Sequence, residues 1–265
     1  MDNVVIRGGG DLATGIGHRL FRAGFKIIIM ELEKPLSIRR KVSFCEAIYS
    51  GEIIVEGVKA VYCKDLDSSL KAIEEGNIPV MIDNLGINIH KIKPLAVVDC
   101  TLVKRNIGTN KDMAPITIAV GPGYIAGEDV NLVVESKRGH ELGKVIYKGP
   151  AAINTGIPGE IMGYSDERII RAIVSGPIKW NYQIGDLIDK YAVVGSISNK
   201  DIKAQISGVI RGLIKEGLYV DEGLKIGDID PRGIQEYATT ISDKARSIAG
   251  GVLEALMYLI NVKKL

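Results

Sequence analysis

The residues best suited to bind a phosphate group lie in a glycine turn near the start of the chain, Gly8-Gly9-Gly10-Asp11-Leu12-Ala13. The turn fits the G-x-G-x-x-A pattern, follows an apolar strand and precedes a helical pattern, and Glu31 ends the next strand. Glycines let the backbone approach an anion, and the N–H groups at a helix start stabilise phosphate. Glu31 could accept hydrogen bonds from ribose hydroxyls. A tight turn without a ligand explains the same pattern. The candidate binding residues here are Gly8, Gly9, Gly10, Asp11, Ala13, Thr14 and Glu31.

A second candidate for chemistry is the thiol of Cys45, which follows the basic run Arg39-Arg40-Lys41. Ser43 and Glu46 have the spacing of a capping box, so we expect Ser43 to cap a helix that carries Cys45 in its first turn. The helix dipole and the cations would lower the pKa of the thiol, which makes Cys45 the candidate catalytic residue and Arg39 and Arg40 candidate ligand-binding residues. The alternatives are a buried, unreactive cysteine and a solvated row of cations.

Glycines and charged residues are also dense in the middle of the chain. Gly-Pro-Gly after a strand predicts a backbone loop at the carboxyl end of a sheet, where open α/β folds bind ligands. An arginine fork and a histidine follow, and the polar, turn-rich segment 154–160 could line the same crevice. A lone histidine is more often structural. The candidate binding residues of this region are Gly121, Gly123, Gly127, Glu128, Asp129, Arg138 and His140.

Composition narrows the function classes. The net charge of +2 and the aromatic content of 5% argue against nucleic acid as a partner. Three widely spaced cysteines and three histidines predict neither a disulfide framework nor a metal site. The start of the chain lacks the order of a signal peptide, and no uncharged apolar run reaches the ~20 residues that cross a bilayer. We therefore expect a cytoplasmic protein that does not act at membranes.

The pattern of apolar segments predicts the elements that position these residues. Strands are expected near 4–6, 27–30, 78–82, 96–100 and 116–120, with helices at 11–23, 43–49 and 68–75. This alternation predicts a Rossmann-like α/β fold with a mostly parallel sheet. A helix is expected from about Ser242, and Gly250-Gly251 in its middle predicts that another element packs closely there.

A different pattern appears beyond residue 180, where short β segments alternate with glycines and the Gln183–Asp189 run is echoed at Lys225–Asp230. The run from Ala204 to Ile226 resembles the second half of a lipoyl or biotinyl carrier domain. The position that carries the modified lysine in such domains is Ile197 here, so neither lipoyl nor biotin is expected. We predict three regions: a Rossmann-like domain with central glycine-rich loops (1–180), a carrier-like barrel-sandwich β domain (181–234), and a C-terminal helix packed on the core (235–265).

An ordered set of motifs along nearly the whole chain resembles the YqeB family, accessory proteins of selenium-dependent molybdenum hydroxylases. The N-terminal part is also similar to the Rossmann domain of XdhC-type chaperones, which handle molybdenum cofactor. The motifs are Val5–Gly15, Arg39–Ala47, Val98-Asp99 with Asn106–Thr109, Gly121–Gly123 through Ala126–Val130, Arg138–His140, Asn154–Gly159, Ile226–Arg232, and Ile241–Arg246 to Gly250-Gly251.

The resemblance implies a maturation role. The chain would bind a phosphate-bearing ligand, either a molybdopterin-type cofactor or a nucleotide such as NAD(P), and would assist sulfur or selenium insertion into a molybdenum hydroxylase client. Cys45 would relay the chalcogen. The alternatives are an NAD(P)-dependent oxidoreductase and a non-catalytic scaffold that docks the hydroxylase. A homo-oligomer is expected.

Overall fold

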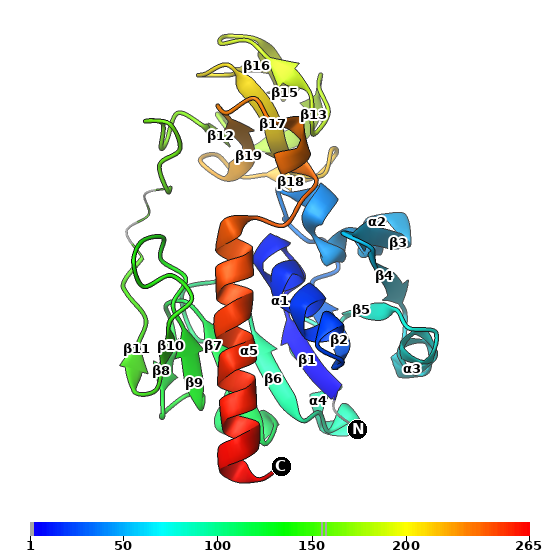
Figure 1. The fold of residues 1–265 in the computed structure, drawn as a ribbon. Coiled ribbons are helices and arrows are strands. Elements are labelled where there is room, and N and C mark those ends of the chain that lie inside the picture. Colours follow the sequence, from blue (N-terminus) through cyan, green and yellow to red (C-terminus); the bar gives the residue numbers. More distant parts are fainter. Residues whose placement is uncertain (1–2, 155, 157) are drawn as a thin grey trace. The chain divides into compact units, whose positions relative to one another are not determined.

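A computed structural model describes residues 3–154, 156 and 158–265 of the chain. The chain divides into two compact units. Unit 1 comprises Met1–Pro35, Ser43–Thr155 and Ile241–Leu265, and unit 2 comprises Leu36–Val42 and Gly156–Thr240. Each unit is formed by segments that lie far apart in the sequence, because the chain passes between the units several times (Figure 1).

Unit 1 is built on a nine-stranded sheet with the order β10-β9-β7-β6-β1-β2-β5-β4-β3. Its strands are β1 (Asn3–Arg7), β2 (Lys26–Glu31), β3 (Glu52–Val55), β4 (Val58–Cys63), β5 (Ile78–Ile82), β6 (Ala96–Asp99), β7 (Ile116–Val120), β9 (Leu132–Val134) and β10 (Val145–Ile146). The five strands expected in this region from apolar runs are confirmed as β1, β2, β5, β6 and β7. A short pair, β8 (Ile125–Ala126) and β11 (Gly149–Pro150), lies beside this sheet.

Helices lie on both faces of the sheet. They are α1 (Asp11–Arg22), α2 (Ala47–Ser50), α3 (Leu66–Glu74), α4 (Ile89–Ile92) and α5 (Asp243–Lys263). On one face Ile6 lies under Gly17 of α1, and on the other Val5 and Met81 share a buried cluster with Ala72 of α3 and Ile89 of α4. Two 3-10 turns of the described residues belong to unit 1, at Phe44–Glu46 and Lys111–Met113, and two belong to unit 2, at Arg40–Val42 and Gln235–Ala238.

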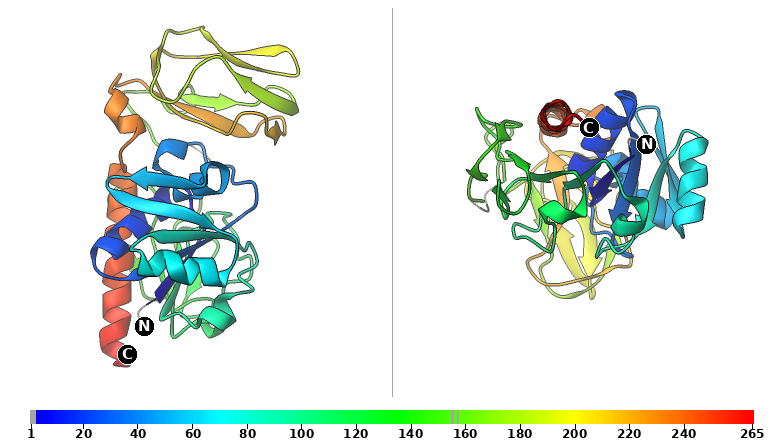
Figure 2. Two further views of the ribbon diagram at one scale, coloured as in Figure 1. Left: turned by 90° about the vertical axis from the view of Figure 1, so that its right-hand side faces the viewer. Right: turned by 90° about the horizontal axis from the view of Figure 1, so that it is seen from below.

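Two long helices of unit 1, α1 and α5, run side by side and parallel (Figures 1 and 2). Small residues allow the approach: a Cβ on Gly15 would lie 2.8 Å from the Ala245 Cβ, and one on Gly251 would lie 2.0 Å from the Gly143 carbonyl oxygen. The close packing predicted at Gly250-Gly251 is therefore found at Gly251. Because the helices are parallel, their N-terminal ends lie at the same edge of the sheet.

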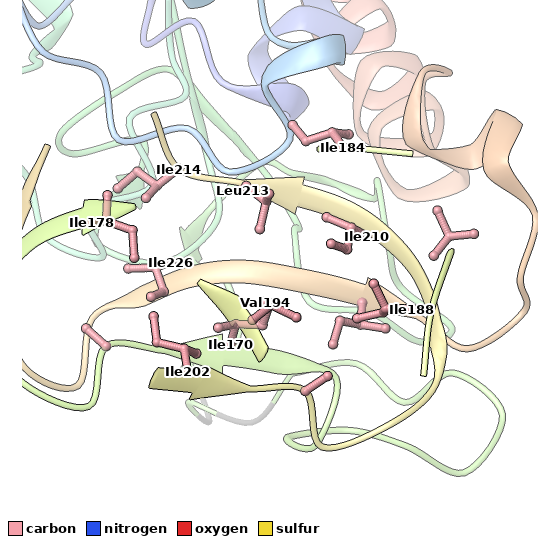
Figure 3. Packing of buried hydrophobic residues seen from close by; sticks show 14 of the residues in the cluster. Ile170, Ile178, Ile184, Ile188, Val194, Ile202, Ile210, Leu213, Ile214 and Ile226 are labelled. Atoms are coloured by element: carbon pink, nitrogen blue, oxygen red, sulfur yellow. The ribbon is translucent and has the colours of Figure 1, made fainter. Parts of the chain in front are cut away.

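Unit 2 consists of two four-stranded antiparallel sheets, β12-β19-β17-β14 and β16-β15-β13-β18. Their strands are β12 (Ile169–Arg171), β13 (Gly176–Trp180), β14 (Leu187–Ile188), β15 (Val193–Ile197), β16 (Lys200–Lys203), β17 (Gly208–Leu213), β18 (Tyr219–Val220) and β19 (Lys225–Asp230). Buried isoleucines, valines and leucines from both sheets, among them Ile178, Val194, Ile210 and Ile226, pack into one core (Figure 3).

The expected fold class, a Rossmann-like sheet followed by a lipoyl-like barrel, needs correction. The large sheet is mixed, since β3 and β10 at its edges run antiparallel to their neighbours. Its order also departs from the Rossmann order, because the β3–β4 hairpin turns at Glu56 and Gly57 and β5 then inserts between β4 and β2. The second region consists of separate antiparallel sheets, and its first strand begins at Ile169, before the expected start at 181.

The described residues form an α/β protein with one long apolar helix. By length and composition alone, α5 could cross a membrane. Its buried face, which includes Ile248, Val252 and Leu256, packs on α1 and the sheet, as in the core helix of a globular protein.

Candidate functional site

Polar residues of unit 1 gather where the parallel strands end. Arg7 ends β1, Glu31 ends β2 and Asp99 ends β6, while the glycine turn 8–10 follows β1. Parallel strands place these ends at one edge of the sheet, which is where open α/β sheets hold ligands. Among the described residues, no group of three or more His, Cys, Asp or Glu side chains is placed to hold a metal ion.

The three glycines of the turn differ in what surrounds them. Gly8 has a positive φ of 93°, and a Cβ there would lie 2.8 Å from the Cys100 carbonyl oxygen. A Cβ on Gly9 would lie 3.0 Å from the Cys45 Cβ, whereas one on Gly10 meets nothing within 4 Å. Gly8 and Gly9 are therefore required by packing, and only Gly10 borders open space.

Gly10 is also the N-cap of α1, and no side chain caps this helix. The first N–H groups of a helix have no partner inside it, and they carry the positive end of its dipole. The N–H groups of Gly8 and Gly9 are occupied, the first by the Met30 carbonyl oxygen at 2.8 Å and the second by the Glu31 Oε2 at 2.6 Å. The groups available to an anion are thus the N–H groups of Leu12 and Ala13 in the first turn of α1.

Glu31 has a structural task in addition to the one that the sequence predicts. Its Oε1 accepts the Leu32 N–H at 2.8 Å while its Oε2 accepts the Gly9 N–H, so the side chain ties the end of β2 to the glycine turn. Burial raises the pKa of this carboxyl group, and the two backbone N–H groups act in the opposite direction. A ribose would have to use the second lone pair of an oxygen that is already bonded.

Lys244 is a residue of this edge that the sequence analysis did not select. It occupies the first turn of α5, beside the N-terminus of α1. Burial lowers the pKa of its amine, the charge of Arg138 lowers it further, and Asp11 acts in the opposite direction. No short motif marks such a lysine; only the parallel packing of α1 and α5 brings it to the turn.

Arg138 and Asp243 close the same end of α5. The Arg138 Nη1 donates to the Asp243 Oδ2 at 2.7 Å and its Nη2 to the Asp243 Oδ1 at 3.1 Å, a bidentate pair on the protein surface. His140 is exposed in the loop that follows. The arginine fork expected to bind a ligand is therefore engaged by a carboxylate of the chain itself.

A buried polar network lies beneath the edge. The Arg7 Nη1 lies 3.6 Å from the Asp99 Oδ2 and donates to the Thr109 hydroxyl, which donates in turn to Asp99 at 2.5 Å. Tyr124 is buried nearby, and its burial and the Asp99 carboxylate raise the pKa of its hydroxyl. Each of these charges has a partner inside the network, so its main effect is to fix the loop 101–109.

The structure separates the predicted central constellation. Gly121 and Gly123 follow β7 at the carboxyl edge, where their missing side chains make room for Ser136 and Arg105. In contrast, the turn of Gly127, Glu128 and Asp129 lies by the amino ends of β7 and β9, since Lys111 donates to the Gly127 carbonyl oxygen at 2.6 Å just before β7 begins. The two groups therefore lie toward opposite ends of β7. Thr155 and Ile157, in the predicted polar segment, lie outside the described residues.

The predicted helix at Cys45 needs correction. Ser43 makes no side-chain cap, the residues Phe44–Glu46 form a 3-10 turn, and α2 begins only at Ala47. Cys45 is 1% exposed and its backbone N–H donates to the Gly9 carbonyl oxygen at 2.9 Å. Cys63 and Cys100 are also buried, which raises the pKa of both thiols. A catalytic role for Cys45 stays a prediction, and its thiol would first have to become accessible.

The basic run belongs to unit 2, where it fastens a short segment to the β sheets. Arg39 donates to the carbonyl oxygens of Tyr237 and Thr240, Arg40 to that of Leu213, and Lys41 to that of Ile184. Partly buried, charge-assisted bonds to carbonyl groups account for these cations as structural residues.

Comparison of the sequence with known proteins identifies a close relative. No protein-family model matches the chain. The uncharacterized protein YqeB of Escherichia coli (strain K12) is 51% identical over 258 residues, which is 97% of this chain and 48% of that protein. The chain is a homologue of YqeB. That part of the expected resemblance is confirmed, and the chain spans about half the length of its YqeB relative.

Solved structures give only distant likenesses. They include an aspartoacylase family protein from Mesorhizobium loti (TM-score 0.27, 12% identity, 86% of this chain and 84% of that one). A succinylglutamate desuccinylase/aspartoacylase from Rhodobacter sphaeroides has a TM-score of 0.22 at 12% identity, over 32% of this chain and 29% of that one. TM-scores this low carry no argument about activity.

These neighbours nevertheless differ from what we expected, which was proteins that handle molybdenum cofactor. The expected function, maturation of selenium-dependent molybdenum hydroxylases with its oxidoreductase and docking-scaffold alternatives, is corrected: none of the proteins found is described by such an activity, and it is not retained. The YqeB relative, which is described as uncharacterized, supplies no activity in its place.

Proposed function

We propose that unit 1 binds a small phosphate-bearing molecule at the N-terminus of α1. The observation that supports this most directly is the open space at Gly10, next to a helix start that no side chain caps. Backbone N–H groups and the helix dipole favour an anion at such a position. Whether the ligand is a molybdopterin-type cofactor or a nucleotide stays a prediction.

The cation of Lys244 supports the same proposal. It is partly buried in the first turn of α5, whose N-terminus lies beside that of α1, so two helix dipoles and one ammonium group act on the same region. The negative charges of Asp11 and Asp243 oppose the positive potential of the two helix ends and the ammonium group. Arg138 offsets Asp243 through its bidentate pair, which leaves Lys244 and Asp11 as the charges whose balance a ligand phosphate would change.

A substitution at Gly10 tests the proposal. Serine at this N-cap supplies a hydroxyl that accepts a first-turn N–H, so Gly10→Ser should keep or slightly raise the stability of the protein, by a few tenths of a kcal/mol. The same hydroxyl occupies the groups that a phosphate needs. We therefore expect at least a tenfold loss of affinity for the best of ATP, NAD⁺ and inorganic phosphate, measured by isothermal titration calorimetry.

The matched control is Gly9→Ala, which presses on Cys45 and should destabilise the fold without lining the open space. Unchanged binding in Gly10→Ser, or no binding of any of the three compounds by the unaltered protein, would overturn the proposal.

The cellular location, the oligomeric state and the class of partner are predicted from the sequence alone. We expect a cytoplasmic protein that forms a homo-oligomer and has a small molecule, rather than nucleic acid or a membrane, as its partner. Cell fractionation and light scattering coupled to gel filtration measure the location and the number of subunits.

A further inference from the structure

Unit 2 carries a group of buried charges that the proposed function does not use. They lie on and beside the sheet β12-β19-β17-β14, whose strands β17 and β19 bring Arg211 next to Asp228 and Asp230. Arg168 precedes β12 and Arg232 follows β19. The five side chains of this cluster are Arg168, Arg211, Asp228, Asp230 and Arg232.

Two of the arginines are paired with carboxylates of the cluster. Arg168 donates to Asp228 Oδ1 at 2.9 Å. Arg232 donates to both oxygens of Asp230, from its Nε to Oδ1 at 2.9 Å and from its Nη2 to Oδ2 at 2.6 Å, and its backbone N–H adds a bond to Oδ1 at 3.1 Å. Arg232 also lies over the Tyr237 ring, 4.5 Å from its centre, which fixes its position.

Arg211 differs from its neighbours because its nearest carboxylate already has other donors. Its Nε lies 3.7 Å from the Asp230 Oδ2, an ion-pair distance that is too long for a hydrogen bond. The side chain is 9% exposed, and within the described part of the chain the buried Nε has no hydrogen-bond partner. The Nε of Arg168 also lacks an acceptor, but that guanidinium keeps its bond to Asp228.

The charges of the cluster do not balance. Three guanidinium groups face two carboxylates, which leaves one positive charge. Burial alone would raise the pKa of Asp230, but the bonds from Arg232 and the charge of Arg211 outweigh it and lower the pKa, so the carboxylate stays ionised. A buried arginine without a hydrogen-bonded acceptor is costly, and a ligand oxyanion removes that cost by supplying both the charge and the acceptor.

We propose that Arg211 is the anion-binding residue of a second ligand site, in unit 2, that takes the carboxylate or phosphate group of a small molecule. The guanidinium group presents paired N–H donors that match the two oxygens of either group. Arg232 and Asp230 hold the floor of this site, and Arg211 supplies the unmatched charge. The site uses other residues and another unit than the phosphate site at α1.

The direct test follows the N–H signal of the Arg211 Nε by NMR of the full chain. The signal is assigned by its loss in Arg211→Lys. Sodium phosphate and sodium acetate are titrated separately at constant ionic strength, so that the two arms distinguish a phosphate from a carboxylate ligand. We expect a saturable shift of the Arg211 signal with at least one of them. No saturable shift with either anion would overturn the proposal.

Arg171 is the matched control. It lies in β12 of the same sheet and already donates to the Asp166 Oδ1 at 3.1 Å, so its signal should not move. Repeating the titration on Gly10→Ser separates the two sites: the Arg211 shift should persist there even when binding at α1 is lost. A shift that disappears in Gly10→Ser would assign the anion to unit 1 and contradict a site at Arg211.

A stability measurement distinguishes this site from a structural ion pair. Without added oxyanion, Arg211→Met should change the thermal midpoint little, because it removes an unmatched charge, whereas Arg168→Met leaves Asp228 unpaired and should lower the midpoint clearly. Phosphate or acetate should raise the midpoint of the unaltered protein more than that of Arg211→Met. Equal losses in the two variants with no oxyanion effect would show that Arg211 is structural.

Discussion

At the scale of single residues, the reactivity of the Lys244 amine tests the proposed phosphate site of unit 1. Burial lowers the pKa of its amine, so more of it is uncharged and nucleophilic near neutral pH than in the unfolded chain, where lysine has a pKa of about 10.4. We expect acetic anhydride to label Lys244 at a lower pH in the folded protein than in the same protein in urea. Peptide mass mapping across pH measures both profiles.

A bound phosphate would protect Lys244 from this reagent, and it would restore the charge of the amine. The labelling profile should therefore move upward in pH when the tightest-binding compound is added, and it should not move in Gly10→Ser. Identical profiles in the folded and urea-unfolded chain would show that Lys244 is solvated and has no special role.

Residue identities also explain which site predictions were possible. A run of three glycines between a strand and a helix is a local pattern, so the position of the turn could be predicted, although the atoms that Gly8 and Gly9 approach, in Cys100 and Cys45, lie far along the sequence. The roles of Arg39 and Arg138 were not readable. Their acceptors, Tyr237 and Asp243, lie far along the sequence, so an engaged cation and a ligand-binding cation look the same in the sequence.

At the scale of elements, Glu56 links the β3–β4 turn to the start of α5. It accepts the Ile241 N–H at 2.8 Å and two bonds from Arg246 at 2.7 and 2.9 Å. Burial alone would raise the pKa of this carboxyl group, but these donors outweigh it and lower the pKa. The stabilisation is complete above the unfolded pKa of about 4.3 and is lost as the pH falls through the folded value.

Glu56→Gln should therefore cost about 1 kcal/mol at pH 7, a modest figure because solvent screens the partly exposed pair. The difference from the unaltered protein should shrink as the pH falls below about 4. Urea unfolding at pH 7, 5, 4 and 3 measures it. Glu52→Gln, which removes a surface pair with Lys59, is the control and should stay within about 0.5 kcal/mol. A cost for Glu56→Gln that is independent of pH would show that the charge is unimportant.

Elements with strong local signals were predicted well. The buried strands β1, β2, β5, β6 and β7 are continuous apolar runs, and α5 begins at the expected place, where Ser242 caps it by accepting the Ala245 N–H at 3.2 Å. The β3–β4 hairpin was missed, although Glu56-Gly57 with positive φ is a hairpin turn pair. The similarity of Gln183–Asp189 to Lys225–Asp230 does not reflect similar local structure. Gly185 has a φ of 104°, whereas Gly227 lies inside β19.

At the scale of the whole molecule, strand order and unit composition decide the fold, and both depend on contacts between distant segments. The insertion of β5 between β2 and β4 follows from no single stretch of sequence, and neither does the membership of 36–42 in unit 2. Ile38 lies against Gly212 of β17, where a Cβ would be 2.7 Å from its carbonyl oxygen. A glycine in a strand predicts a close approach, but the sequence does not name the partner.

The two units have separate cores, and this predicts separate responses to substitution. Gly212→Val forces Ile38 away from β17 within unit 2, whereas Gly15→Val forces α1 away from Ala245 in unit 1, and overpacking of this kind costs about 1–3 kcal/mol. Trp180, the single tryptophan, lies against the core of unit 2 and reports its unfolding by fluorescence. Gly212→Val should lower the midpoint of unfolding followed by tryptophan fluorescence. Gly15→Val should lower mainly the midpoint followed by the helical circular dichroism signal, because α1 and α5 belong to unit 1. If both variants shift both transitions equally, the units unfold as one cooperative structure. If the two units unfold separately, Gly212→Val should still bind the phosphate-bearing ligand at α1. The glycine turn and Lys244 both lie in unit 1, which this substitution does not touch.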